Sequence, residues 1–75
     1  MDLPEFQRRL ARRVRVLREK RGLRQEDLED FELSWKSVQE LEYGTTDPKI
    51  STLLKLCRAF GVTLPELLRF DESKR

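Results

Sequence analysis

The 75-residue sequence predicts a single all-α domain built from five helices. Apolar residues recur at spacings of three and four along most of the chain, which is the period of an amphipathic helix. Residues typical of helix starts and ends stand between these stretches, and no stretch shows the alternation of a β-strand. We expect the domain to span residues 1–70, followed by a polar tail at residues 71–75.

The first helix is expected over residues 3–21. Asp2 and Glu5 have the spacing of a capping box, Pro4 suits a first turn, and Gly22 ends the helix. Five arginines, at positions 8, 9, 12, 13 and 15, lie mostly outside the buried stripe. They form either a solvated face or contacts to phosphate. The buried stripe consists of Phe6, Leu10, Val14 and Leu17.

The next two helices are expected over residues 25–31 and 35–43, with Leu33 filling the corner between them. Ser34 can cap the second of the pair, because its hydroxyl accepts from free N–H groups of the following turn. Gly44 can end it, since glycine tolerates the left-handed conformation of a helix stop. Two short helices joined by such a corner have the layout of a helix-turn-helix, whose second helix can enter a DNA major groove.

The fourth helix is expected over residues 50–60 and the fifth over residues 64–70. Gly61 ends the fourth, and Thr63 and Glu66 have capping-box spacing at the start of the fifth. The fourth helix should bury a wide apolar face made of Ile50, Leu53, Leu54, Leu56, Cys57 and Phe60. The apolar residues of the fifth are Leu64, Leu67, Leu68 and Phe70.

The charges are strongly segregated although the net charge is only +2. Residues 1–24 carry nine basic and three acidic side chains, whereas residues 25–47 carry one basic and eight acidic side chains. The basic segment fits a polyanionic partner, and the acidic segment is the strongest argument against one.

Several functional classes are excluded or disfavoured by composition. Histidine is absent and Cys57 is the only cysteine, which excludes an intramolecular disulfide and a Cys/His metal cluster. We expect no cofactor, no metal, no small-molecule ligand and no enzymatic activity, since no nucleophile–base pair and no phosphate-cradling glycine loop is found. No apolar run suits a membrane span or a signal peptide, so a cytoplasmic protein is expected.

Three blocks of the chain together resemble one known family. They are LREKRGLRQEDL at residues 17–28, SWKSVQELEYG at residues 34–44 and DPKISTLLKLCRAFGVTLPELL at residues 47–68. These blocks resemble the Cro/repressor-like helix-turn-helix family, which includes the DNA-binding domains of lambdoid phage repressors. The resemblance implies a five-helix, lambda-repressor-like DNA-binding domain, with residues 35–43 as the recognition helix.

The resemblance also implies roles for particular residues. Gln25 resembles a glutamine that contacts a DNA phosphate and braces the recognition helix. Arg18 and Glu42 match positions of a structural ion pair. The family's base-reading positions correspond to Trp35, Lys36, Ser37 and Glu40, and its backbone-contacting loop corresponds to Thr45, Thr46 and Lys49.

Side-chain chemistry adds to these expectations. Lys36 can donate to guanine or to a phosphate, and Glu40 can accept from the amino group of cytosine. Gln39, on the flank of the recognition helix, is a further candidate, and Arg24 is a candidate phosphate contact. Trp35 either touches a thymine methyl or sugar, or covers the corner above Leu33.

The chain departs from the family pattern at three places. The stretch from Leu23 to Gly44 is one residue short, and Glu32 replaces the usual turn glycine. Arg24 stands where the family has a Ser or Thr cap, and Trp35 replaces a polar residue.

The leading hypothesis is a sequence-specific DNA-binding transcriptional regulator that binds a palindromic operator as a homodimer. Its interface is expected at Leu64, Pro65, Leu68 and Phe70; the alternative is that these residues close the core of a monomer. The alternative is a protein-interaction module, such as the antitoxin of a toxin–antitoxin pair, whose acidic segment binds a basic protein.

Overall fold

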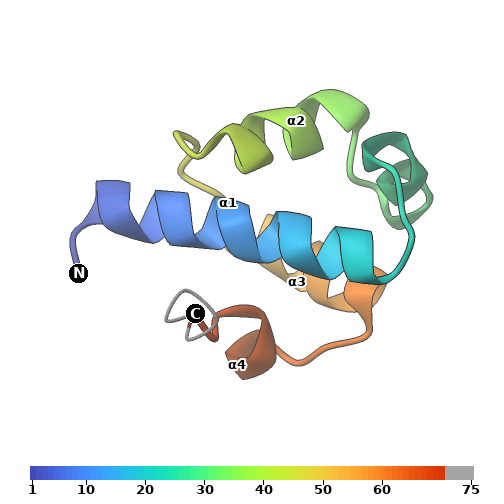
Figure 1. Cartoon of the computed structure of the whole chain (residues 1–75). Helices are drawn as coiled ribbons and strands as arrows, with labels where there is room; N and C mark the ends of the chain where they lie inside the picture. Colours follow the sequence, from blue (N-terminus) through green and yellow to red (C-terminus); the bar gives the residue numbers. More distant parts are fainter. Residues whose placement is uncertain (71–75) are drawn as a thin grey trace.

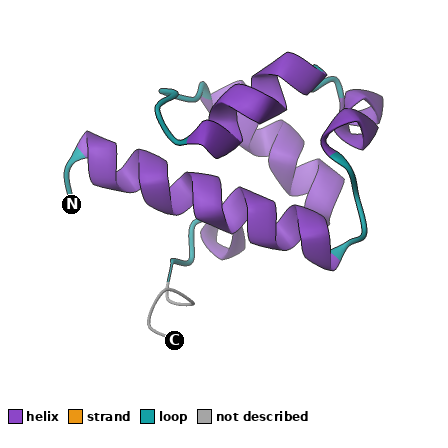
Figure 2. Cartoon of the chain, turned by 45° about the horizontal axis from the view of Figure 1, so that its top comes forward, coloured by secondary structure: helices purple, strands orange, loops and turns teal. Residues whose placement is uncertain are grey.

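The computed structural model describes residues 1–70, and the expected polar tail lies outside the described residues. The elements are α1 (Leu3–Lys20), η1 (Gln25–Phe31), α2 (Trp35–Tyr43), α3 (Ile50–Phe60) and α4 (Leu64–Leu67). All five are helical, and none of the described residues is in a strand. Figures 1 and 2 show the long α1 running through the domain, and α2 and α4 lie on opposite sides of it in Figure 1. The predicted all-α, five-helix fold is confirmed.

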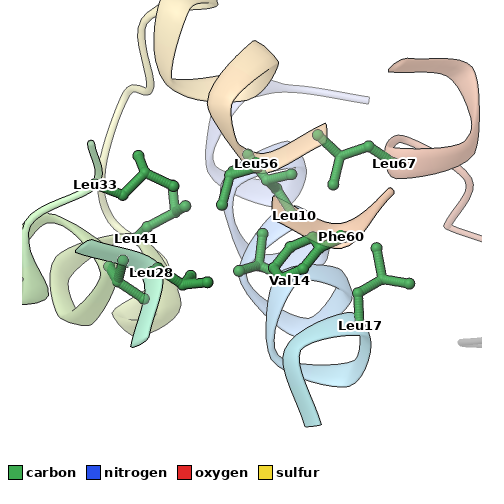
Figure 3. Packing of buried hydrophobic residues seen from close by; sticks show 10 residues of the cluster. Leu10, Val14, Leu17, Leu28, Leu33, Leu41, Leu56, Phe60 and Leu67 are labelled. Carbon is green, nitrogen blue, oxygen red and sulfur yellow. The ribbon is translucent and has the colours of Figure 1, made fainter. Parts of the chain in front are cut away.

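The buried core draws side chains from every element. Leu10, Val14 and Leu17 of α1 face Phe60 and Leu56 of α3, as Figure 3 shows. The rest of the core comes from the other elements. Leu28 lies in η1, Leu33 in the corner, Val38 and Leu41 in α2, and Leu67 in α4. Burying one leucine side chain contributes roughly 1.5–3 kcal/mol. The core therefore fixes α2 against α1, and this sets the direction of the outward face of α2.

The corner between η1 and α2 carries the largest local departure from expectation. The expected helix at 25–31 forms, but it is a 3-10 helix. A 3-10 helix rises about 2.0 Å per residue, against about 1.5 Å in an α-helix, so fewer residues span the same length. Glu32 then takes φ 64°, the left-handed conformation that favours glycine, at the position where a glycine was expected.

Two expectations about the C-terminal half are wrong. The last helix ends at Leu67 instead of residue 70. The apolar face of α3 is narrower than expected, because Ile50 is 73% exposed and Leu54 is 50% exposed. Only Leu56 and Phe60 of that helix are fully buried. Both residues that stay exposed lie in the first half of α3.

Candidate nucleic-acid interface

Helix α2 is fixed at both ends and along one face. The Ser34 hydroxyl accepts from the backbone N–H of Ser37 at 3.1 Å, which caps the first turn. Gly44 ends the helix at φ 95°, where a side chain would strain the backbone. Val38 and Leu41 are 1% and 4% exposed and anchor the inner face. The opposite face is therefore presented to solvent by a rigidly placed helix.

The residues expected to read DNA all lie on that exposed side of α2. Trp35 is 47% exposed, so its indole is neither fully covered nor fully free. Its backbone N–H donates to the Glu29 carboxylate at 3.4 Å, which ties the start of α2 to η1. The exposed candidates are Trp35, Lys36, Ser37, Gln39 and Glu40. They give this face one cation, one anion, an amide, a hydroxyl and an aromatic ring.

A buried carboxylate connects three elements behind this face. Glu42 of α2 is 5% exposed and accepts from Arg18 of α1 through Nε–Oε2 at 2.7 Å and Nη2–Oε1 at 3.0 Å. Hydrogen bonding to Glu42 raises the pKa of Arg18 above its ordinary value. Gln25, at the start of η1, donates to the same carboxylate at 3.2 Å. The structure thus brings Arg18, Glu42 and Gln25 together in one polar network.

Arg24 is held by acidic neighbours within η1. Its Nη2 lies 3.1 Å from Oδ1 of Asp27, and its Nη1 lies 3.8 Å from Oε2 of Glu26. The hydrogen bond from the Arg24 side chain, followed by the one from its backbone N–H, lowers the pKa of Asp27. Asp27, three residues into η1, accepts that N–H at 2.7 Å, which is one half of a capping box, whereas the first-turn N–H groups that a Ser or Thr at position 24 would cap receive no side-chain bond. Arg24 therefore reaches a phosphate only by sharing its charge with two carboxylates.

The loop after α2 is hydrogen-bonded to α2 and to α1. The Thr46 hydroxyl donates to the Glu40 carbonyl at 3.0 Å, and the Gln7 side chain donates to the Thr45 carbonyl at 3.4 Å. Lys49 is exposed at the start of α3. Ser37 and Glu40 of α2 share one open hollow with Thr46, Lys49 and Thr52. The expected backbone-contacting residues thus stand beside the expected base-reading residues.

Sequence reasoning missed Tyr43, which is 81% exposed at the end of α2. Tyr43 lines an open hollow with Gln39, Glu40, Thr45 and Thr46. Its position four residues after Gln39 was the available signal, because positions i and i+4 share a helix face. Thr52 of α3 was also missed.

The residues expected at a dimer interface are only partly exposed to solvent. Leu64, Leu68 and Phe70 are partly buried against the core, and Pro65 is exposed. The rings of Phe70 and Phe6 meet edge to face with centroids 5.5 Å apart. These residues therefore stabilise the monomer, whatever further role they have.

Other chemistry finds little support within residues 1–70. This region contains no group of three or more acidic or cysteine side chains able to hold a metal ion. None of its helices is long and apolar enough to cross a membrane. Burial raises the pKa of the Cys57 thiol, so a smaller fraction of it is present as the reactive thiolate.

Two short helices meeting at a tight corner, the second capped and outward-facing, define a helix-turn-helix domain. A family model described as a helix-turn-helix domain matches residues 9–70, and this chain belongs to that family. It is also 38% identical over 61 residues to the HTH-type transcriptional regulator DdrOP3 of Deinococcus deserti. That match covers 80% of this chain and 47% of the relative, so the chain spans about half of its length. No solved structure gives a significant match.

Proposed function

We propose that this chain is a sequence-specific DNA-binding transcriptional regulator of the Cro/repressor-like type, with α2 reading the major groove. One observation carries the proposal: α2 is anchored on its inner face by Val38, Leu41 and Glu42 while its outer face is free. The free face offers the donor and acceptor groups that distinguish base pairs in the major groove. The relative in Deinococcus deserti, described as a transcriptional regulator, supports the same assignment.

In this proposal, Lys36 and Glu40 read base edges, with Ser37, Gln39 and Trp35 alongside. Gln25 and Lys49 contact phosphates on either side of α2, together with Thr45 and Thr46. Arg24 contributes less than a free arginine, because Asp27 and Glu26 already hold it. Phosphate contacts position a protein on the duplex and base contacts give specificity, so the two groups have separable effects.

The acidic segment is compatible with this docking. Glu26 and Asp27 are paired with Arg24, and Glu29 accepts from the backbone of Trp35. Glu42 is buried in the network with Arg18. A large part of the negative charge is thus used within the fold. The exposed remainder includes Asp30, Glu32 and Glu40.

We further propose that the regulator acts as a homodimer on a palindromic site, since a two-fold interface matches a two-fold operator. Pro65 is exposed and Leu64, Leu68 and Phe70 are half-buried beside it in sequence, so their outer edges are the candidate contact. Sedimentation analysis of the wild type and Pro65→Glu tests this. The expected result is a dimer that the charged variant converts to monomer, and a monomeric wild type bound to DNA as one copy would contradict it.

The rival is a protein-interaction module, as in a toxin–antitoxin pair. The observation in its favour is the exposed acidic surface of η1 and the corner, which would suit a basic protein. DNA binding and protein binding are compatible in such a system. The rival becomes the better assignment only if the chain has no preference for any duplex sequence.

Selection from a randomised duplex library at two salt concentrations tests the proposed function. We expect a palindrome to be enriched by the wild type and lost in Lys36→Ala. The matched control is Lys20→Ala, which removes another exposed lysine from the end of α1 and should retain the enrichment. No enrichment by the wild type at low salt would overturn the regulator assignment in favour of a protein partner.

A further inference from the structure

Three arginines of α1 form a continuous basic surface beside the end of α2. Arg8, Arg12 and Arg15 are spaced four and three residues apart, which places them on one helix face. Together with Tyr43 and Gly44 they line one open hollow. A second hollow continues from Arg8 and Arg12 toward the N-terminal end of α1. We call Arg8, Arg12 and Arg15 the arginine stripe.

The charge of the arginine stripe is largely uncompensated. Arg8 and Arg12 are exposed, and neither makes a hydrogen bond or an ion pair with any residue between 1 and 70. Glu5, the acid beside them on α1, is already paired with Arg9 at 2.8 Å. Like charges at i and i+4 slightly destabilise a helix, and a bound anion would offset this repulsion.

The Arg15 end of the arginine stripe lies next to the proposed phosphate contact Gln25. Arg15 donates from Nη2 to the Glu42 carbonyl at 3.4 Å, and its Nε lies 3.6 Å from Oε1 of Glu42. The same Oε1 accepts from Gln25 at 3.2 Å. Oε1 of Glu42 therefore links Gln25, at the start of η1, to Arg15, the C-terminal arginine of the stripe. Figure 1 shows α2 lying along α1, with η1 on the side of the C-terminal end of α1.

We propose that the arginine stripe binds phosphates of the DNA strand that passes Gln25, extending the contact beyond the helix-turn-helix. This inference rests on the proposed function and names a second phosphate-binding surface for it. Arginine suits phosphate because its planar fork donates two parallel hydrogen bonds. Seven residues of α-helix separate Arg8 from Arg15, about 10 Å, which is long enough to reach more than one phosphate.

The composition of the hollow favours a phosphate strand over an acidic protein. A protein interface needs an apolar centre that excludes water. Here the apolar side chains are limited to Ala11 and Val16, among the three arginines and Tyr43. The hollow also includes Glu42, whose carboxylate already accepts from Arg18 and Gln25. A surface of this kind binds a hydrated, highly charged backbone. It also accounts for how a chain with an acidic segment retains affinity for DNA.

The test is the salt dependence of binding to a random-sequence duplex by the full chain and by Arg8→Gln/Arg12→Gln. Each lost phosphate contact makes the slope of log K against log salt shallower by about 0.9. We therefore expect the double variant to be shallower by about 2 for each bound protomer. We expect the affinities for the random duplex and for an enriched duplex to fall by the same factor. Arg12→Gln alone should give about half of the change in slope.

The matched control is Arg58→Gln/Arg69→Gln, which removes the same charge from two other exposed arginines. Arg58 lies in the last turn of α3, and Arg69 follows α4, which lies on the other side of α1 from α2 (Figure 1). The control slope should equal that of the wild type. Circular dichroism of each variant establishes that the fold is retained.

The outcomes separate this inference from the proposed function. An unchanged slope in Arg8→Gln/Arg12→Gln, with sequence preference still lost in Lys36→Ala, overturns the arginine stripe and leaves the regulator intact. Equal slope changes in the stripe variant and its control reduce the effect to net charge and also overturn the stripe. Failure of the wild type to bind any duplex overturns the function itself and assigns the stripe to a protein partner.

Discussion

Arg18 on α1 and Glu42 on α2 form a two-point ion pair, with Nε–Oε2 at 2.7 Å and Nη2–Oε1 at 3.0 Å. Arg18 also donates from Nη1 to the Leu23 carbonyl at 2.8 Å, in the turn that leads into η1. Since Gln25 joins the same carboxylate, the pair sets the relative positions of α1, η1 and α2. Stability and the geometry of the proposed interface therefore depend on the same two side chains.

Removing Glu42 should damage folding and DNA binding together. Glu42→Ala leaves Arg18 nearly buried without its partner, and breaking such a pair costs roughly 3 kcal/mol or more. A chain of this size has a total stability on the order of 5–10 kcal/mol, so the loss is a large fraction. Urea unfolding and duplex binding of the same sample measure the two effects.

The control for the ion pair is Glu19→Ala, which removes an exposed carboxylate of α1 that has no hydrogen-bond or ion-pair partner in the described part of the chain. It should unfold at nearly the wild-type urea concentration. Glu42→Gln keeps a hydrogen-bond acceptor for Arg18, so its stability should lie between that of Glu42→Ala and that of Glu19→Ala. An unchanged melting temperature in Glu42→Ala would show that the pair has no structural role.

Ser34 is expected to matter through the cap of α2. Ser34→Ala removes the oxygen that accepts from the Ser37 backbone, and loss of such a cap typically costs about 1 kcal/mol. Because α2 is only nine residues long, fraying of its first turn should also move Trp35 and Lys36. Denaturant unfolding gives the stability change, and Trp35 fluorescence reports on the first turn.

Ser51→Ala serves as the comparison for Ser34→Ala. Ser51 is exposed in the first turn of α3 and makes no side-chain hydrogen bond with the described residues. Alanine has the better helix propensity, so this variant should be neutral or slightly more stable. A stability loss of equal size in both variants would assign the Ser34 effect to something other than the cap.

Replacing Glu32 by glycine should increase the stability of the fold. A non-glycine residue in the left-handed region costs roughly 1–2 kcal/mol, and Glu32 has φ 64°. Glu32→Gly should therefore raise the free energy of unfolding by roughly 0.5–1 kcal/mol, after the entropy cost of glycine is included. Glu32→Ala keeps the strained conformation while removing the charge. An equal gain in both variants would mean that relief of charge repulsion, and not of backbone strain, is the cause.

The sequence predicted most of the secondary structure because caps and apolar spacing are local signals. Ser34 and Gly44 gave both ends of α2, and Thr63 gave the start of α4. The exposure of Ile50 and Leu54 was not predictable, since an apolar face is buried only where another element covers it. The end of α4 was misjudged because Leu68 and Phe70 are apolar without being helical.

The contacts of the candidate site also divide into local ones, which the sequence can indicate, and long-range ones, which it cannot. Arg24 and Asp27 are three residues apart, so their spacing alone could have indicated the ion pair. The contact of Arg15 with the Glu42 carbonyl joins residues 27 positions apart, and nothing in the local pattern specifies it. The sequence pattern likewise predicted a helix over residues 25–31 without distinguishing 3-10 winding from α winding. Long-range placement therefore had to come from the structure.

The capping box of α4 should make stability depend on pH through Glu66. The Thr63 backbone N–H donates to Oε1 of Glu66 at 2.8 Å, and the Thr63 hydroxyl does so at 3.1 Å. These bonds, the backbone one first, hold the pKa of Glu66 below its ordinary value of 4.5. Because the folded state favours the ionised form, the stabilisation is complete above that ordinary value. It is lost as the pH falls through the lower pKa of the folded protein.

Glu66→Gln isolates this contribution, because glutamine does not titrate. The wild type should be more stable than the variant at about pH 7, and this difference should be smaller at about pH 3. Urea unfolding at both pH values gives the difference, and the other carboxylates cancel in the comparison if their effects are additive. Glu19→Gln, without such bonds, should differ little from the wild type at either pH. A difference for Glu66→Gln that stays constant with pH would mean that the Thr63 bonds do not select the ionised carboxylate.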